Sequence, residues 1–364
     1  MDSIPQVLHH SRLLSSKAGH SATVLGTARC YWAALLPRCI SLYSSDRCSP
    51  APSAVSKCKL ETKRKQNGKL YFSWMPELPE VETIRMGLAK LLPGKTIADV
   101  WHDWPKGFPN APADVARFLV GAKVKKINRR AKVLIIDLSS GYSLVIHLKM
   151  TCQLVYVGKK RFGAGHPNSD LVGDLPSKAT RVVIDFTDKS KLFFNDQRKF
   201  GWMRLIPTIE IPEIDFFRSV GPEPLEDDFS AKDFIERLAR RKNTSIKAAL
   251  LDQTVIAGIG NIYADESLFA ARIHPASRVV DVPRASLVTL YSDLRDVLKL
   301  SIKKGGSSDK NYVDARGKKG SYLSFAQVFR KQGQPCPRCG TEIVKIRVAG
   351  RGTHICPKEQ RTRK

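Results

Sequence analysis

The sequence lacks long apolar runs and is poor in acidic residues. Its modest apolar stretch at residues 30–36 is far too short to cross a bilayer, so no membrane span is expected. The 34 Asp and Glu residues are outnumbered by 61 Lys and Arg, which gives the 364-residue chain a formal net charge of +27. This excess predicts a polyanionic partner, because basic side chains neutralise phosphates. A ribosomal or merely solubilising charge is the alternative.

Residues 1–74 are rich in Ser and Arg and contain few acids. Such a composition is typical of an organelle transit peptide, and the basic run at residues 57–69 would suit nuclear import or nucleic-acid binding. We interpret residues 1–74 as an extension outside the mature protein, which is either removed or placed upstream of a true start at Met75. The chemistry of the residues that follow motivates this interpretation.

Residues 76–83, Pro-Glu-Leu-Pro-Glu-Val-Glu-Thr, combine two prolines and three carboxylates with only two apolar side chains. If Pro76 is the first residue of the finished chain, its secondary amine is a nucleophile that can attack an aldehyde-like sugar carbon and form an iminium. Glu77 and Glu80 would then serve as proton donor and orienting group. The alternative is a helix start, with Pro in the first turn and acidic side chains that complement the helix dipole.

Cysteine is sparse, and only three of the eight residues form a pattern. Cys336 and Cys339 make a CxxC pair, and with Cys356 they resemble three quarters of a two-CxxC zinc ribbon. Glu359 stands where the fourth cysteine is expected. Because carboxylate and imidazole also ligate zinc, we predict one structural zinc ion completed by Glu359 or His354, with an unmetallated hairpin as the alternative. The other cysteines are predicted to be inert thiols: Cys30, Cys39, Cys48, Cys58 and Cys152.

Alternating apolar runs and turn residues predict a β-rich domain over residues 75–206. Its strands are expected at residues 133–138, 143–148, 153–157, 181–186 and 192–194, after a helix at residues 83–92.

A proline-bearing linker is predicted over residues 207–224, followed by a helical domain over residues 225–304. Helical periodicity is present at residues 231–239, 246–251, 263–271 and 284–303. The Gly-, Ser- and Lys-rich residues 305–324 predict a mobile loop, and residues 325–364 contain the cysteine hairpin.

Two glycines and an asparagine, Gly258, Gly260 and Asn261, lie just before one of these helices. Backbone N–H groups and the helix dipole at such a turn can hold a phosphate. A dinucleotide site is excluded, because the third glycine and a preceding βαβ unit are missing. A plain tight turn is the alternative.

These segments, in this order, resemble the formamidopyrimidine-DNA glycosylases, and the resemblance covers residues 75–364. It implies an α+β multidomain protein with an N-terminal β-sandwich and flanking helices, a C-terminal helix-two-turn-helix domain and a zinc-ribbon-like β-hairpin. The implied function is base-excision DNA repair. A bifunctional glycosylase and abasic-site lyase would remove 8-oxoguanine and formamidopyrimidines by β,δ-elimination.

The resemblance also assigns roles to single residues. Pro76 matches the family's nucleophile, and Glu77 matches the residue that protonates the opening deoxyribose. Lys132, in the basic run at residues 128–132, matches a lysine that holds phosphate and assists elimination. Asn261 would bind the phosphate beside the lesion, while Arg351 would grip DNA and assist the second elimination.

Residues 147–150 and 196–201 resemble the family's intercalation elements. A duplex base must be flipped out before it can be attacked, so Met150 and Phe200 are expected to fill the gap and Arg198 to bond the orphaned partner base. For Met150 and Phe200 an ordinary core position is the alternative. Three further DNA contacts are expected: His147, Lys242 and Lys247.

We therefore expect a monomeric enzyme that acts on double-stranded DNA with oxidised bases. One alternative is an endonuclease VIII-like glycosylase for oxidised pyrimidines, and another is a non-catalytic relative that binds damaged DNA. The expected location is inside the cell with DNA: the cytoplasm or nucleoid if the chain starts at Met75, or the mitochondrion or nucleus if residues 1–74 are genuine.

Overall fold

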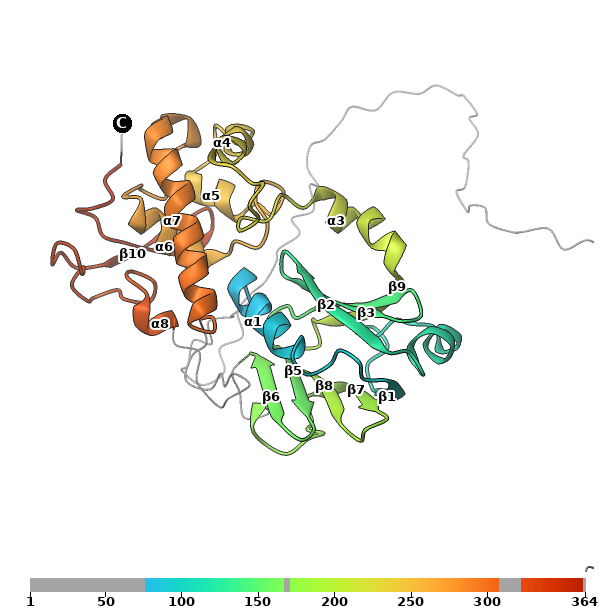
Figure 1. The fold of residues 1–364 in the computed structure, drawn as a ribbon. Coiled ribbons are helices and arrows are strands. Elements are labelled where there is room, and N and C mark those ends of the chain that lie inside the picture. Colours follow the sequence, from blue (N-terminus) through green and yellow to red (C-terminus); the bar gives the residue numbers. More distant parts are fainter. Residues whose placement is uncertain (1–75, 167–170, 308–321, 363–364) are drawn as a thin grey trace, which may run out of the picture. The chain divides into compact units, whose positions relative to one another are not determined.

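The computed structural model describes residues 76–166, 171–307 and 322–362, all within one compact unit, Lys69–Lys364 (Figure 1). The predicted extension over residues 1–74 lies outside the described residues. The same holds for residues 308–321, which form most of the predicted loop.

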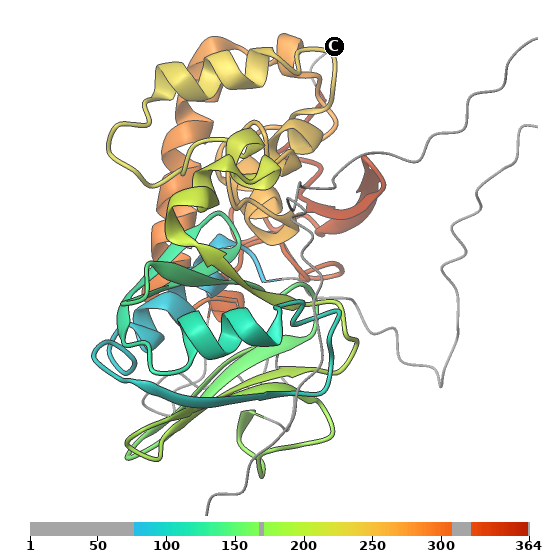
Figure 2. The same ribbon diagram turned by 90° about the vertical axis from the view of Figure 1, so that its right-hand side faces the viewer.

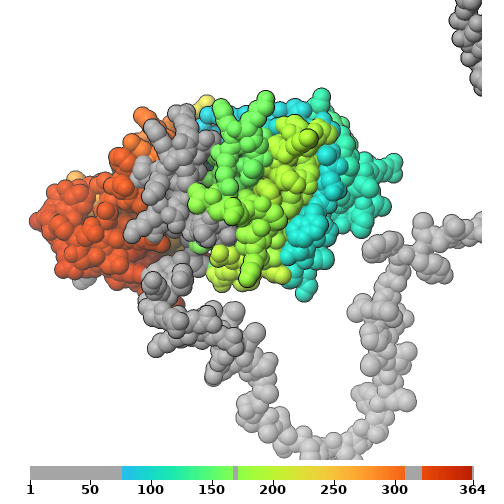
Figure 3. Space-filling model, turned by 90° about the horizontal axis from the view of Figure 1, so that it is seen from below, coloured from blue at the N-terminus to red at the C-terminus, as the bar shows by residue number. Residues whose placement is uncertain are grey.

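Two antiparallel sheets form the β-rich domain (Figure 1). One is five-stranded, in the order β1-β7-β8-β5-β6, and the other is four-stranded, in the order β2-β3-β4-β9. In the space-filling view, the segments of β6, of β7 and β8, and of β1 follow one another across one face, as this strand order requires (Figure 3). The strand bounds are β1 Ile97–His102, β2 Val124–Arg130, β3 Val133–Leu138, β4 Tyr142–His147, β5 Cys152–Val157, β6 Arg161–Gly165, β7 Thr180–Phe186, β8 Lys191–Asp196 and β9 Trp202–Pro207.

Strand β3 shows why an apolar run predicted a strand here. Successive side chains of a strand point to opposite faces. Leu134 and Ile136 belong to the main core, which residues of both sheets share, whereas Val133 and Ile135 pack on the other face with Ile211. A strand that is covered on both faces is apolar throughout, so the run is continuous rather than alternating.

The predicted linker contains more structure than we expected. Residues 207–224 include the 3-10 helix η3, Thr208–Glu213, and the helix α3, Asp215–Ser219. Ile211 and Phe216 cover the outer face of the four-stranded sheet. Pro207 directly precedes η3 and Pro212 lies within it, so the predicted linker consists in part of short helices that pack on the sheet.

Helix α1, Leu78–Leu88, begins five residues before the start that periodicity predicted. Glu77 is its N-cap, and the side chain of Glu80 accepts a hydrogen bond from the Glu77 backbone N–H in a capping box. Ile84 and Leu88 on its buried side join the core of the two sheets. The helix-start interpretation of residues 76–83 is thus correct as local structure, and it places both carboxylates in the interior.

The helical domain has its own core, which α4, α5, α6 and α7 share. Serine caps begin two of these helices: the side chain of Ser230 accepts from the Asp233 N–H, and that of Ser245 from the Ala248 N–H. The bounds are α4 Ala231–Ala239, α5 Ile246–Leu251, α6 Asn261–Ala270 and α7 Arg284–Lys303, close to those predicted. The remaining short elements are α2 Pro112–Asp114, the π-helix η1 Val115–Leu119, η4 Val279–Asp281 and α8 Tyr322–Phe325.

Strands β10, Val344–Val348, and β11, Arg351–Ile355, form the predicted hairpin near the C-terminal end (Figure 2). Its cysteines share a small core with Phe269 at the end of α6 and with Val328. Among the described helices, none combines the length and the apolar character that a bilayer span requires.

Candidate active site and nucleic-acid interface

Glu77 and Glu80 are buried at the start of α1 against the turn that precedes α6. The N–H of Ile262 donates to Glu77 Oε1 at 3.1 Å, and the N–H of Tyr263 lies 3.5 Å from Glu77 Oε2. A Cβ atom on Gly260 would lie 2.1 Å from the Glu77 carboxyl carbon, so only glycine leaves room for this carboxylate. The glycine that sequence analysis linked to phosphate binding is therefore also required by the position of Glu77.

Residues 258–263 also hold two other parts of the site. The carbonyl of Gly258 accepts from the Leu78 N–H at 3.0 Å, and the carbonyl of Ile259 accepts from Lys132 Nζ at 2.9 Å. Residues from the start of α1 and from the β2–β3 turn thus meet on one segment of the helical domain. The structure brings together Glu77, Glu80 and Lys132, which are far apart in the sequence.

Burial changes the acid–base behaviour of this cluster. It raises the pKa of Glu77 to about 7, and the negative Glu80 adds to the rise, whereas Lys132 and the two backbone N–H groups oppose it. Burial also lowers the pKa of Lys132, as does the positive charge of Arg351, although both carboxylates oppose this. Glu77 can therefore hold a proton near neutral pH, and Lys132 can release one more readily than an exposed lysine.

Glu80 links α1 to α6 and to the first end of the predicted loop. Its Oε1 atom accepts from the Tyr263 hydroxyl at 2.5 Å and from the Ser307 N–H at 2.7 Å. Gly306, with φ of +84°, accepts from the N–H of Tyr322 at 3.2 Å. The described ends of residues 305–324 are therefore held near the buried Glu80.

The turn that carries Lys132 is fixed by Glu223, a buried residue of the predicted linker. Glu223 accepts from the Ala131 N–H at 2.5 Å and pairs with Arg129 at 2.7 Å and with Arg130 at 3.1 Å. Ala131 has a positive φ of 52°, a conformation that a non-glycine residue keeps only when its surroundings enforce it. The basic run is thus largely paired rather than solvated, and it aims Lys132 inward.

Met150, Arg198 and Phe200 lie next to one another, as the intercalation prediction requires. Arg198 Nη1 is 3.9 Å from Met150 Sδ, and its guanidinium lies 4.7 Å from the centre of the Phe200 ring. Phe200 is 50 % exposed, which disfavours a core role for it. The loop is shaped by Asp196, whose carboxylate accepts from the N–H groups of Arg198, Phe200 and Gly201.

His147 lies beside this loop in a neutral state. Its Nδ1 accepts from the Lys149 N–H at 3.0 Å. Burial, together with Lys149 and Lys132, lowers the pKa of His147 to about 3. A DNA contact through His147 would therefore use a neutral ring, with the Nε2 atom as hydrogen-bond donor.

Arg351 is exposed at the first position of β11, and Asn261 fixes the hairpin next to it. The Asn261 side-chain amide donates to the Gly352 carbonyl at 3.1 Å. The amide has two hydrogens, so one remains for a phosphate. Lys242 is exposed, in agreement with its predicted role.

Lys247 does not fit the predicted phosphate contact. Its side chain has no exposed surface and pairs with the equally buried Asp265 at 2.5 Å. The same ammonium donates to Thr353 Oγ1 at 2.7 Å, while Asp265 accepts from the His354 N–H at 2.9 Å. Lys247 therefore holds the hairpin on α6 instead of binding DNA directly, because its donors are already used inside the protein.

The three cysteines of the hairpin meet as predicted, with ligand atoms within 4.8 Å of one another. Thiolates around a tetrahedral zinc lie roughly 3.8 Å apart, given Zn–S bonds of about 2.3 Å, so the three sulfurs fit a structural zinc ion. The Thr341 hydroxyl and N–H lower the pKa of Cys339 to about 7, which favours the thiolate that zinc requires.

Neither predicted fourth ligand belongs to this group in the described part of the chain. His354 Nδ1 lies 3.2 Å from Asp265, and the Glu359 carboxylate pairs with Arg272 at 3.2 Å and Arg338 at 3.8 Å. Each of the two carries its polar atoms toward another partner here, so a fourth ligand from Glu359 or His354 stays a prediction.

Several residues of the site carried no local signal in the sequence. Gly260 was singled out only for phosphate binding and not for its contact with Glu77, and Tyr263 resembled any aromatic residue of a helix. The acidic residues Glu223 and Asp265 and the hydroxyl of Ser307 were missed altogether. Their partners lie tens to hundreds of positions away, as with Glu80 and Ser307, which are separated by 227 positions. The only available signal was general: acids are scarce in this basic chain, and a charged side chain is rarely buried unless it is paired, so each buried acid is expected to have a specific partner.

A buried acid and a buried lysine on the glycine turn that opens α6, with an exposed aromatic side chain and a zinc hairpin, are the arrangement expected of a DNA-processing enzyme of the helix-two-turn-helix class. Family models agree along the chain: the formamidopyrimidine-DNA glycosylase N-terminal domain matches residues 75–203, the H2TH domain residues 220–312, and a zinc finger found in FPG and IleRS residues 333–358. This chain belongs to the formamidopyrimidine-DNA glycosylase family.

Individual relatives lead to the same family. The formamidopyrimidine-DNA glycosylase of Pelotomaculum thermopropionicum is 39% identical over 290 residues, which cover 79% of this chain and 100% of that protein. A crystal structure of a Lactococcus lactis FPG variant with Fapy-dG-containing DNA matches with a TM-score of 0.70 and 34% identity, over 79% of this chain and 100% of that one. MutM in complex with carbocyclic 8-oxo-G-containing DNA gives a TM-score of 0.68 at 35% identity, with the same coverage. The predicted family, fold class and DNA partner are confirmed.

Proposed function

We propose that this chain excises oxidised purines from duplex DNA with Pro76 as the nucleophile and then cleaves the strand by β,δ-elimination. The chain is a base-excision repair glycosylase and lyase. The observation that carries the residue-level proposal is the Glu77 carboxylate, which follows Pro76 directly, is buried against the N–H groups of Ile262 and Tyr263, and has a pKa of about 7.

In the proposed reaction, the Pro76 amine attacks C1′ of the lesion nucleotide, the glycosidic bond breaks, and the base leaves with the proton that the amine gives up. Glu77 donates its proton to the ring oxygen, the C1′–O4′ bond breaks, and an iminium forms between C1′ and Pro76. Loss of a C2′ proton then expels the 3′ phosphate, and a second elimination expels the 5′ phosphate. Lys132 would hold a phosphate and assist elimination, and Arg351 would assist the second step.

This mechanism requires a free amine at Pro76, because a proline nitrogen inside a chain is an amide. The family model begins its match at residue 75, and the Pelotomaculum relative is matched over its full length by about four fifths of this chain. We infer that the active form starts at Pro76, either after removal of residues 1–75 or after a start at Met75 and loss of that methionine. Whether residues 1–74 direct the protein to a mitochondrion or nucleus is testable by locating the full chain and the shorter form in cells.

Borohydride trapping tests the nucleophile. Protein that begins at Pro76 should form a covalent complex with an 8-oxoguanine duplex, since reduction fixes the iminium as a stable amine. A matched protein with one serine added before Pro76 should bind the duplex but give no trapped product, and neither should the uncleaved 364-residue chain. Equal trapping by all three proteins would reject Pro76 as the nucleophile.

The DNA interface is proposed from the same geometry. Met150 and Phe200 fill the gap left by the flipped nucleotide, Arg198 bonds the partner base, and Asn261, Lys242 and the DNA grip of Arg351 act on phosphates. Removal of a phosphate contact should weaken the binding of damaged and undamaged duplexes alike, by roughly 1–3 kcal/mol for a charge-assisted bond. Variants of Asn261 that alter only lesion preference would contradict its phosphate role.

A further inference from the structure

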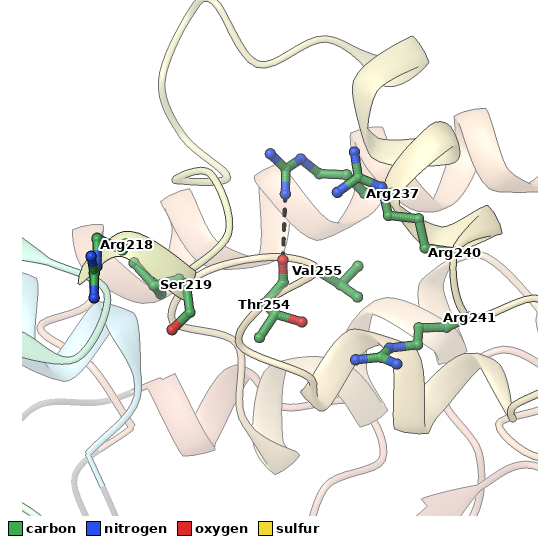
Figure 4. A pocket seen from close by; sticks show the side chains of 8 residues that line it. Arg218, Ser219, Arg237, Arg240, Arg241, Thr254 and Val255 are labelled. Carbon is green, nitrogen blue, oxygen red and sulfur yellow. Dashed lines mark hydrogen bonds between the residues drawn. The ribbon is translucent and has the colours of Figure 1, made fainter. Parts of the chain in front are cut away.

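Four arginines line a cavity of about 430 Å³ that shares no residue with the site described above (Figure 4). Arg218 and Ser219 come from α3 on one side, Arg237 comes from α4 and Arg240 from the C-cap of α4 on the other, and Thr254 lies between them (Figure 4). The fourth arginine, Arg241, follows α4. The cavity therefore lies between the linker and the helical domain.

The positive charge of this cavity is only partly neutralised. Arg241 pairs with Asp252 at 2.7 Å, and Arg218 pairs with the exposed Asp215. Arg240 makes no ion pair or side-chain hydrogen bond with any residue in the described ranges.

Arg237 is held next to that unpaired charge. The only hydrogen bond of its side chain among the described residues is a long one of 3.3 Å to the Thr254 carbonyl. Burial and the charges of Arg240 and Arg130 lower the pKa of Arg237, and only the Asp233 carboxylate opposes this. Asp233 already accepts a hydrogen bond from the Ser230 hydroxyl at the start of α4. The positive charges of Arg237 and Arg240 thus lie close enough to affect each other, without a dedicated counter-ion among the described residues.

We propose that this cavity binds a phosphate oxyanion. The planar guanidinium presents paired N–H donors that match two phosphate oxygens, and a phosphate group with close to two negative charges balances two uncompensated arginines. The hydroxyls of Ser219 and Thr254 already donate to the backbone of α3 and to Asp252, so the arginines supply the donors. The volume admits a diphosphate or a phosphate of a nucleic-acid strand.

Binding of inorganic pyrophosphate to the zinc-loaded full chain tests the site. Calorimetry at constant ionic strength, with chloride as the balancing anion, should show saturable binding that Arg240→Gln weakens about tenfold or more, as loss of a charge-assisted contact does. Arg237→Gln should have the same effect. Arg284→Gln, which removes an exposed arginine at the start of α7, is the matched control and should bind like the unmodified protein.

The source of the phosphate is decided by duplex binding as a function of salt. If a DNA backbone phosphate occupies the cavity, Arg240→Gln should reduce the slope of log K against log salt by about 0.9, the value for one phosphate contact, whereas Arg284→Gln should not. If pyrophosphate binding is lost but the slope is unchanged, the cavity serves a free phosphate compound. Absence of saturable pyrophosphate binding together with an unchanged slope would overturn the proposal.

Discussion

The buried carboxylates of Glu77 and Glu80 and the zinc hairpin differ in how many independent interactions hold them. Glu77 depends on two backbone N–H groups and on the absence of a side chain at Gly260. The hairpin has three clustered thiols on one side, and on the other the buried pair of Lys247 and Asp265. The comparison teaches that a segment held by two independent sets of contacts tolerates the loss of one metal ligand. The hairpin has two such sets, so Glu359 can stand where a fourth cysteine is expected. Glu77 has only one set, so we expect no such tolerance there.

The largest effect is expected at Glu77. Glu77→Gln keeps the shape, and its single amide oxygen can still accept from the Ile262 N–H, but the side chain cannot transfer a proton to the opening sugar. Base release by the protein that begins at Pro76 should fall about 10²- to 10⁴-fold in single-turnover assays, with duplex binding nearly unchanged. Glu236→Gln, an exposed position on α4, is the control and should release base normally.

The next effect is on stability. Lys247→Met leaves Asp265 buried without its counter-ion, which typically costs about 3–5 kcal/mol of unfolding free energy. Urea denaturation compares it with Lys299→Met, an exposed lysine of α7 that should change stability little. If the two variants unfold at the same urea concentration, the buried pair does not hold the hairpin and the comparison above fails.

The pH dependence of base release follows from the raised pKa of Glu77. The proton donor is present below its pKa of about 7 and is lost as pH rises, so the rate should fall about tenfold per pH unit on the alkaline side. His147 is already neutral over this range, since its pKa is about 3, and it cannot produce this limb. Glu77→Asp should shift the midpoint, whereas a midpoint above pH 9 in the unmodified enzyme would implicate another group.

The smallest effect is expected at the fourth zinc position. Glu359→Cys restores a second CxxC pair and loses ion pairs to two partly exposed arginines, which contribute little. Zinc should bind more tightly by a few kcal/mol at most, a fraction of the roughly 10–16 kcal/mol typical of structural sites. Competition with a chelator measures this, and His354→Ala should leave zinc retention unchanged. A large loss of zinc in His354→Ala would show that the histidine turns toward the metal.

Local sequence patterns determined the elements. The apolar run at residues 133–138 and the helical period at residues 231–239 predicted β3 and α4 with their observed bounds. Each pattern depends only on which faces of one strand or one helix are buried, so it can be recognised in a short stretch of sequence. The start of α1 was placed too late in the sequence. Glu77 and Glu80 form its capping box, but we had interpreted these two residues as catalytic groups and not as a helix start. The short helices of the linker were not predicted, because its prolines do not reveal that apolar side chains of this segment pack on the outer face of β3.

The sequence by itself determined the kind of chemistry: a proline followed by carboxylates, a basic charge, a glycine turn before a helix and a cysteine cluster. Only the tertiary structure decided which groups meet and in what protonation state. Burial raises the pKa of Glu77, Glu223 orients Lys132, and Asp265 removes Lys247 from the DNA contacts. Desolvation and pairing depend on neighbours from distant segments, and that information exists only after the chain has folded.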